Sequence, residues 1–153
     1  MQVCARVVMV SPGGRVLLMK TATWTGDLWV TPGGRVHDGE DIRVAALREA
    51  QEETGLTGVE LGAEIWLREW TYQRHNGQWT PQREHFFLLC CSEFSPNASG
   101  MEHPERNVHQ GYRWWDPVDI EASAERFAPP QIGKLLGELD LNGLPDTPVH
   151  ILG

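Results

Sequence analysis

The stretch Gly33–Leu56, GGRVHDGEDIRVAALREAQEETGL, decides the fold of this chain. Pro32 and the two glycines after it predict a sharp turn, because proline lacks a ladder donor and glycine tolerates positive φ. From Asp41 to Thr54 there is neither proline nor glycine, acids stand at the start, and Gly55 follows. These features predict a helix that begins near Asp41 and ends at a glycine cap.

The predicted helix gathers acidic side chains on one side. At about 100° per residue, Glu49, Glu52 and Glu53 fall within an arc of roughly 100°, bordered by Arg48. Like charges so close weaken an isolated helix, so something must offset their repulsion. A divalent cation is the simplest candidate, since Mg²⁺ and Mn²⁺ take hard oxygen ligands. A lone pair of glutamates would more simply be a solvated helix face.

Helix and turn together resemble the Nudix box, the signature of hydrolases acting on nucleoside diphosphates linked to another moiety. The resemblance is carried by Gly34, Glu40, Arg48, Glu49, Glu52, Glu53, Gly55 and Leu56. The flanks TPGG and GYRWWDPVDI also look like those of a Nudix domain. The resemblance covers residues 2–140 and implies a MutT-like Nudix hydrolase. Layering of the predicted elements agrees with the family's fold, an α/β/α sandwich with a mixed β-sheet.

This resemblance implies a Mg²⁺-dependent pyrophosphohydrolase in which Mn²⁺ could substitute. Glu49 and Glu53 are the expected main metal ligands, and the backbone carbonyl of Gly33 completes the metal shell. Glu52 is expected to be a further ligand, or the base that takes a proton from water. Spacing leaves open which glutamate is the base. Bound metal would also reconcile an acidic protein with a phosphate substrate.

The resemblance assigns supporting roles to other polar residues. Arg48 is expected to orient the glutamates, and Glu40 to help as a secondary acid. Many relatives add an acid from the loop before the strand that here is Gly111–Trp115. By position that acid is Glu105, with Glu102 and Glu84 as alternatives, and a surface acid is the plain alternative for each. The histidines of this loop, His103 and His109, suit magnesium poorly and are expected to be polar loop groups or proton shuttles.

Basic and aromatic side chains provide candidates for substrate binding. Clamps for phosphate could be Arg74, Arg83 and Arg113, because a guanidinium grips phosphate with paired hydrogen bonds. A stacking wall for a base could consist of Trp66, Trp70, Tyr72 and Trp79, although each aromatic alone is more often core or cross-strand packing. Arg6 and Lys20 could also reach a phosphate, but lone basic strand residues are more often solvated edge charges. Trp29 is expected in the core.

Around the helix the chain alternates strands and turns. Expected strands are Val3–Val10, Arg15–Lys20, Asp27–Thr31, Val59–Gln73, Gln78–Cys91 and Gly111–Trp115, with Asn76-Gly77 as a hairpin turn. Ser92–Gln110 is a polar loop, Asp116-Pro117 opens a short helical turn, and Gln131–Leu141 is a final helix. We expect one domain over residues 1–141, followed by an extended or disordered tail over residues 142–153.

Composition restricts the function classes. The 153 residues suit a single domain, and a net charge of −8 argues against duplex nucleic acid or an anionic membrane as main partner. Three cysteines, two of them adjacent, predict no disulfide framework, and no apolar run is long enough to span a membrane. A cytoplasmic setting is therefore expected.

The function stays open in three respects. A catalytically silent Nudix-fold module that binds a nucleotide or a regulatory partner is the alternative to an enzyme, although such modules usually lose helix glutamates. Metal storage is a third reading, but one carboxylate helix is a poor cage for Mg²⁺. The box does not encode the substrate, and the aromatic residues favour a nucleoside tri- or diphosphate. A homodimer is the default assembly.

Overall fold

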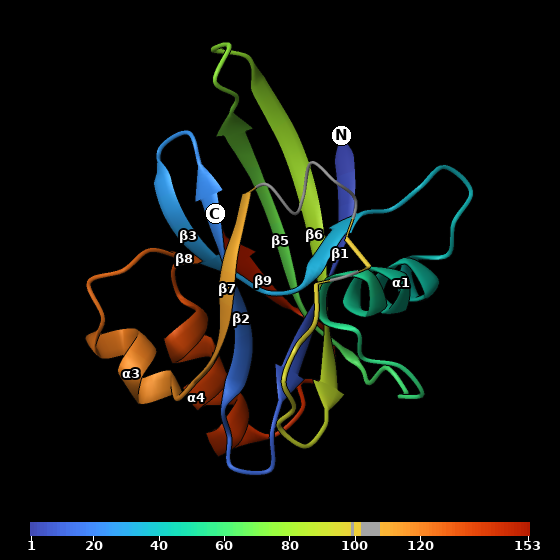
Figure 1. Cartoon of the computed structure of the whole chain (residues 1–153), viewed down its shortest axis with the longest axis vertical. Helices are drawn as coiled ribbons and strands as arrows, with labels where there is room; N and C mark the ends of the chain where they lie inside the picture. Colours follow the sequence, from blue (N-terminus) through green and yellow to red (C-terminus); the bar gives the residue numbers. More distant parts are fainter. Residues whose placement is uncertain (99, 102–107) are drawn as a thin grey trace.

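The computed structural model describes residues 1–98, 100–101 and 108–153, built around a curled mixed β-sheet (Figure 1). Strands lie in the order β8-β3-β2-β1-β6-β5-β9, with β4 paired to β1 and β7 to β2. The elements are β1 (Gln2–Val10), β2 (Val16–Thr23), β3 (Gly26–Val30), β4 (Gly33–Arg35), α1 (Ile42–Thr54), β5 (Glu64–Gln73), β6 (Trp79–Cys90), β7 (His109–Trp115), α3 (Pro117–Ala122), β8 (Phe127–Ala128), α4 (Ile132–Asn142) and β9 (Val149–Leu152).

Helices cover both faces of the sheet. The alanines of α1 pack with Ala5, Val7 and Phe87 on one face, and α4 packs with Val8 and Trp66 on the other. The predicted α/β/α sandwich with a mixed sheet is confirmed, since β1 pairs antiparallel with β2 and β4 but parallel with β6. In the described part of the chain, no helix is both long and apolar enough to cross a bilayer.

Local signals place α1. The side chain of Asp41 caps it by accepting hydrogen bonds from the N–H groups of Arg43 and Val44, and Gly55 ends it with φ 79°. The hairpin between β5 and β6 forms at the predicted Asn76-Gly77 turn. Trp29 is 8% exposed in the core, as predicted.

The prediction for the glycine pair was wrong in part. The chain bends at Thr31 and Pro32, but Gly33 and Gly34 then form the short strand β4, antiparallel to β1. A Cβ atom on Gly33, whose φ is 154°, would collide with the backbone oxygen of Ala5. Gly33 therefore allows the close approach of two backbones within the sheet.

The structure also refines the start of one predicted strand and the tail. β5 begins at Glu64, because Gly62 and Ala63 bond to Leu88 outside the regular ladder. The tail was expected to be either extended or disordered. Its residues Val149–Leu152 are extended, and they form β9, which pairs parallel with β5.

Candidate active site

Glu53 lies between α1 and β4. Its Oε1 atom accepts a hydrogen bond of 2.8 Å from the backbone N–H of Gly33. Burial raises the pKa of Glu53 well above its ordinary value; the Gly33 N–H acts against this, and the neighbouring Glu49 carboxylate adds to it. A buried carboxylate with a raised pKa needs a cation or a proton beside it.

Glu49 lies one helical turn earlier and is 5% exposed. Its Oε1 accepts a 3.0 Å bond from Nη1 of Arg48, whereas its Oε2 is buried without a hydrogen-bond partner in the described residues. Burial raises the pKa of Glu49 despite the Arg48 contact. Gly34 makes room for this carboxylate, because a Cβ atom there would lie 2.6 Å from it.

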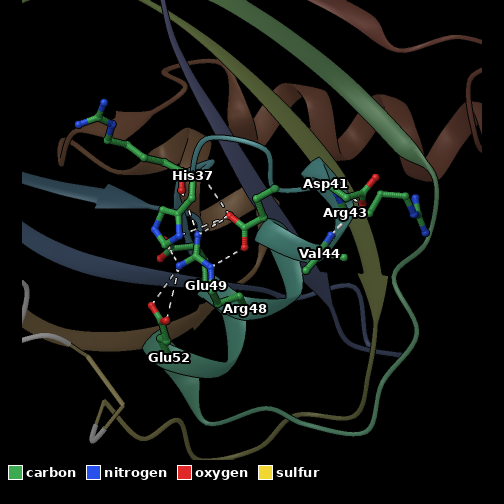
Figure 2. Close-up of polar contacts among 9 residues, drawn as sticks. His37, Asp41, Arg43, Val44, Arg48, Glu49 and Glu52 are labelled. Carbon is green, nitrogen blue, oxygen red and sulfur yellow. Dashed lines mark hydrogen bonds and ion pairs between the residues drawn. The ribbon is translucent and has the colours of Figure 1, made fainter.

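Arg48 joins the acids of the site, as Figure 2 shows. It donates to both carboxylate oxygens of Glu40, at 2.8 and 3.0 Å, and to the backbone oxygen of Arg35 at 3.1 Å. Nη1 of Arg48 lies 3.0 Å from Glu49 and 3.5 Å from Glu52. One guanidinium thus faces three carboxylates, and acid remains in excess.

Glu40 holds Arg48 in this position. The hydrogen bonds from Arg48, and then the backbone N–H of His37, lower the pKa of Glu40 to about 2. The carboxylate is therefore ionised at every pH at which the protein is handled. Such charge-assisted bonds fix the direction of the guanidinium.

Glu52 is the most open of the three helix glutamates, with 31% of its side chain exposed. Gly100, in the segment between β6 and β7, packs against its backbone. A pocket of about 380 Å³ opens beside Glu52, lined also by Arg48 and Gly55. Of the three helix glutamates, Glu52 has the best access to solvent.

The carboxylate oxygens of α1 fit a hard divalent cation. This conclusion depends on one observation, the unpaired Oε2 of Glu49 next to the buried Glu53. Within the described ranges, no three acidic, histidine or cysteine side chains already converge as a metal cluster. Instead, Nη1 of Arg48 contacts both Glu49 and Glu52 and provides positive charge between them. Oxygen-rich groups of this kind are ligands for Mg²⁺ or Mn²⁺.

A cleft of about 860 Å³ lies between the β2–β3 turn and the β5–β6 hairpin. Of the predicted stacking wall, Trp70, Tyr72 and Trp79 line it, while Trp66 is buried in the core. Trp24, in the β2–β3 turn, connects the two sides of the cleft: its Nε1 donates a hydrogen bond of 3.1 Å to the backbone oxygen of Gln73. Arg35 also lines the cleft and so links it to Arg48.

The three arginines proposed as phosphate clamps lie in different places. Arg74 lines the cleft. Arg83 is exposed and paired with Glu69 at 2.9 Å. Arg113 stacks on Trp115, with 3.6 Å between its guanidinium carbon and the ring centroid. The structure thus brings only Arg74 to the cleft.

The proposed additional acid is not located. Glu105 and Glu102, like His103, lie outside the described residues. Glu84 is 4% exposed and accepts hydrogen bonds from Arg6 at 2.8 Å and from Arg68 at 3.2 Å. His109 lies against the ring of Tyr112, and burial lowers its pKa.

Near the site, Arg6 differs from its sequence-based interpretation, and Tyr112 makes a contact that the sequence did not predict. Arg6 is no solvated edge charge: it is paired with Glu84, and its Nη1 donates to the backbone oxygen of Gly33 at 3.3 Å. Lys20, paired with Asp27 and Glu125 at the surface, does fit that description. Tyr112 donates its hydroxyl to the backbone oxygen of Glu53. Burial, and then the Glu53 carboxylate, raise the pKa of Tyr112 to about 12.

The buried carboxylates of α1 thus lie beside the short glycine strand β4, in a sheet that helices cover on both faces. The family model of the NUDIX domain matches residues 1–135, so the chain belongs to the Nudix family. It is an enzyme, a Nudix hydrolase acting on phosphoanhydride bonds.

Individual relatives agree with this assignment. The chain is similar to an RNA pyrophosphohydrolase of Sphingopyxis alaskensis, 32% identical over 129 residues that cover 77% of this chain and 79% of the relative. An RNA pyrophosphohydrolase of Caulobacter vibrioides is 38% identical over 122 residues, covering 71% and 67%. The solved structure of a C. elegans Ap4A hydrolase has the same fold, with a TM-score of 0.64, 22% identity, and coverage of 92% and 96%.

Proposed function

We propose that the chain is a divalent-cation-dependent pyrophosphohydrolase that acts on the 5′-polyphosphate end of RNA. The observation that carries the metal dependence is the unpaired, buried Oε2 of Glu49 beside Glu53. The RNA end is suggested by the names of the curated relatives. Mg²⁺ is the expected ion, with Mn²⁺ as a substitute.

In this proposal Glu49, Glu53 and the carbonyl of Gly33 hold the ion. When bound, the cation would neutralise charge on phosphoryl oxygens and lower the pKa of a coordinated water. Glu52, which faces solvent, is placed to act as a further ligand or to take the proton from the attacking water. Arg48, which Glu40 holds through Nε and Nη2, would keep its place, and the carboxylates of Glu49 and Glu52 would turn from its Nη1 toward the ion.

The cleft is proposed to bind the first nucleotide. Its volume of about 860 Å³ falls within the usual range for small-molecule sites, and Trp70, Tyr72 and Trp79 offer flat faces for a base. With a net charge of −8, the surface offers little general attraction for a nucleic-acid backbone. Recognition would therefore be limited to the 5′ end of a single strand, as expected for a partner that is not duplex nucleic acid.

A panel of substrates tests the proposal. Purified protein with Mg²⁺ should release phosphate or pyrophosphate from a 5′-triphosphate oligoribonucleotide faster than from a nucleoside triphosphate or from diadenosine tetraphosphate. Glu53→Gln should lower turnover by about 10²–10³-fold, because a metal ligand supplies several kcal/mol at the transition state. If only the free nucleotides are hydrolysed, the substrate is a small nucleotide and not the end of an RNA. Tight nucleotide binding without any turnover would favour the silent module instead.

The proposal also covers setting and assembly. Cys4, Cys90 and Cys91 are free thiols, which agrees with a reducing cytoplasm. A homodimer is proposed only on the general preference of soluble proteins for two-fold assembly, and light scattering of the purified protein would decide it.

A further inference from the structure

Three charged side chains, two buried and one partly exposed, form a row across the sheet next to Gly33. Arg6 on β1, Glu84 on β6 and Arg68 on β5 lie side by side, with Glu84 bonded to both arginines. Arg68 and Glu84 are each 4% exposed. With two guanidinium groups around one carboxylate, the row carries a surplus of positive charge.

Arg6 is the member of this row that reaches the active site. Its Nε bonds Glu84 at 2.8 Å, which anchors one edge of the guanidinium. Its Nη1 reaches the carbonyl of Gly33 at the longer distance of 3.3 Å. Nη2 has no hydrogen-bond partner in the part of the chain that the structure describes, and 20% of the side chain is open to solvent.

The contact with Gly33 concerns an oxygen that the proposed metal site also needs. A guanidinium cannot share one carbonyl lone-pair region with a divalent cation at close range, because both are positive. When the carbonyl binds the ion, Nη1 of Arg6 must give it up. The long Nη1 bond is the weak one, while the short bond to Glu84 can remain.

From this geometry we infer that Arg6 is a substrate-binding residue whose Nη1 and Nη2 exchange the Gly33 carbonyl for a phosphate of the nucleotide when metal is bound. The inference rests on the proposed function and names a residue for the same site. A guanidinium anchored on one side by a carboxylate presents its remaining donors as a pair, which matches two phosphate oxygens. Arg68, on β5, lies two strands beyond Arg6 and serves to balance Glu84.

Binding experiments without turnover test this role. Mn²⁺ is titrated alone, and then adenosine 5′-(α,β-methylene)diphosphate is titrated with Mn²⁺, since its methylene bridge replaces a bond that could be cleaved. In Arg6→Gln the affinity for Mn²⁺ alone should be equal or up to about 10-fold higher, because a competitor for Gly33 is gone. The analogue should bind at least about 10-fold more weakly, the value of a charge-assisted bond.

Controls separate this role from folding. Arg15→Gln removes an exposed, ion-paired arginine at the far end of the same hairpin and should change neither affinity. Arg6→Lys keeps the charge but cannot bond Glu84 and phosphate together, so its analogue affinity should fall between those of wild type and Arg6→Gln. Should Arg6→Gln fail to fold, Arg6→Lys alone decides, and wild-type affinity in it would overturn the inference.

Other outcomes also have definite meanings. Weaker Mn²⁺ binding in Arg6→Gln, or unchanged analogue binding, would overturn the inference. If wild type hydrolyses none of the panel but the analogue still depends on Arg6, the proposed catalysis fails while the phosphate-binding role of Arg6 stands. If wild type turns over normally and Arg6→Gln binds like wild type, only the role of Arg6 fails.

Discussion

Two arginine clusters meet at Gly33, with opposite balances of charge. Around Arg48, one guanidinium faces Glu40, Glu49 and Glu52, so the cluster is acidic. On the other side Glu84 lies between Arg6 and Arg68, so that cluster is basic. The N–H of Gly33 bonds Glu53 of the first region, and its carbonyl accepts from Arg6 of the second.

The difference teaches how an acidic protein can hold a polyphosphate. A surplus of carboxylate attracts a cation, and a surplus of guanidinium attracts an anion. Since both groups reach the backbone of Gly33, metal and phosphate would be brought together there. The acidic cluster is local in sequence and partly open, whereas the basic one is buried and built from distant strands. Variants can therefore perturb one cluster at a time.

The largest effect on stability is expected from the basic cluster. Glu84→Gln leaves two poorly exposed guanidinium groups without their carboxylate, and the free energy of unfolding should fall by about 3–5 kcal/mol. Chemical denaturation measures it. Glu69→Gln, on the exposed pair with Arg83, is the matched control and should change little. Similar values for both variants would show that the buried row is not a distinct structural unit.

Among the kinetic effects, the largest is expected when an added side chain displaces a carboxylate of the acidic cluster. In Gly34→Ala the new methyl group would lie 2.6 Å from the Glu49 carboxylate, which must then move. We expect about a 100-fold loss of kcat/KM with little change in thermal midpoint, because only the end of a flexible side chain is displaced. Gly137→Ala, in an open position on α4, is the control and should keep full activity. Wild-type rates in Gly34→Ala would contradict the position given to Glu49.

A smaller effect is expected in the cleft. Tyr72→Ala removes one stacking face and should raise KM for a nucleotide substrate about 10-fold, since base stacking is worth about 1–3 kcal/mol. Tyr72→Phe keeps the ring and should retain KM. Steady-state kinetics of both variants with one substrate give the comparison. Equal KM values for Tyr72→Ala and wild type would place the base elsewhere.

The smallest effect concerns pH and the metal-free protein. The pKa of Glu49 is raised on folding, so ionisation of this side chain costs stability: its contribution to the free energy of unfolding is fully present below pH 4.5 and is lost as pH rises through the raised pKa. Glu49→Gln should therefore raise the thermal midpoint by about 2–4 °C above that range and have no such effect at pH 4. Melting curves with a chelator test the sign. A gain that is independent of pH would point to packing instead of charge.

Sequence alone predicts the acidic cluster because its parts are close along the chain. The caps of α1, the spacing of its glutamates and the role of Arg48 as their neighbour depend on one helix and a turn. The basic cluster depends on the parallel pairing of β1 with β6, which no local pattern encodes. For that reason the sequence places Arg6 at a strand edge. The Tyr112 contact with Glu53 likewise depends on the pairing of β7 with β2, far away along the chain.

The cleft was predicted only in part, for a related reason. Trp66, Trp70 and Tyr72 alternate along β5 and share one face, but only the register of the sheet decides how deep each one lies. Trp66 falls under α4 and is core, while the other two emerge at the cleft. Strand alternation also turns Arg113 toward Trp115, on the face opposite to Tyr112, which the sequence alone did not predict.

The bond between Trp24 and Gln73 provides a built-in optical signal. The indole is 61% exposed, yet its N–H is tied to the opposite rim. Any ligand that parts the two rims must break this tie and move the indole into a different solvent environment. The fluorescence difference between wild type and Trp24→Phe would therefore follow opening of the cleft without any added dye.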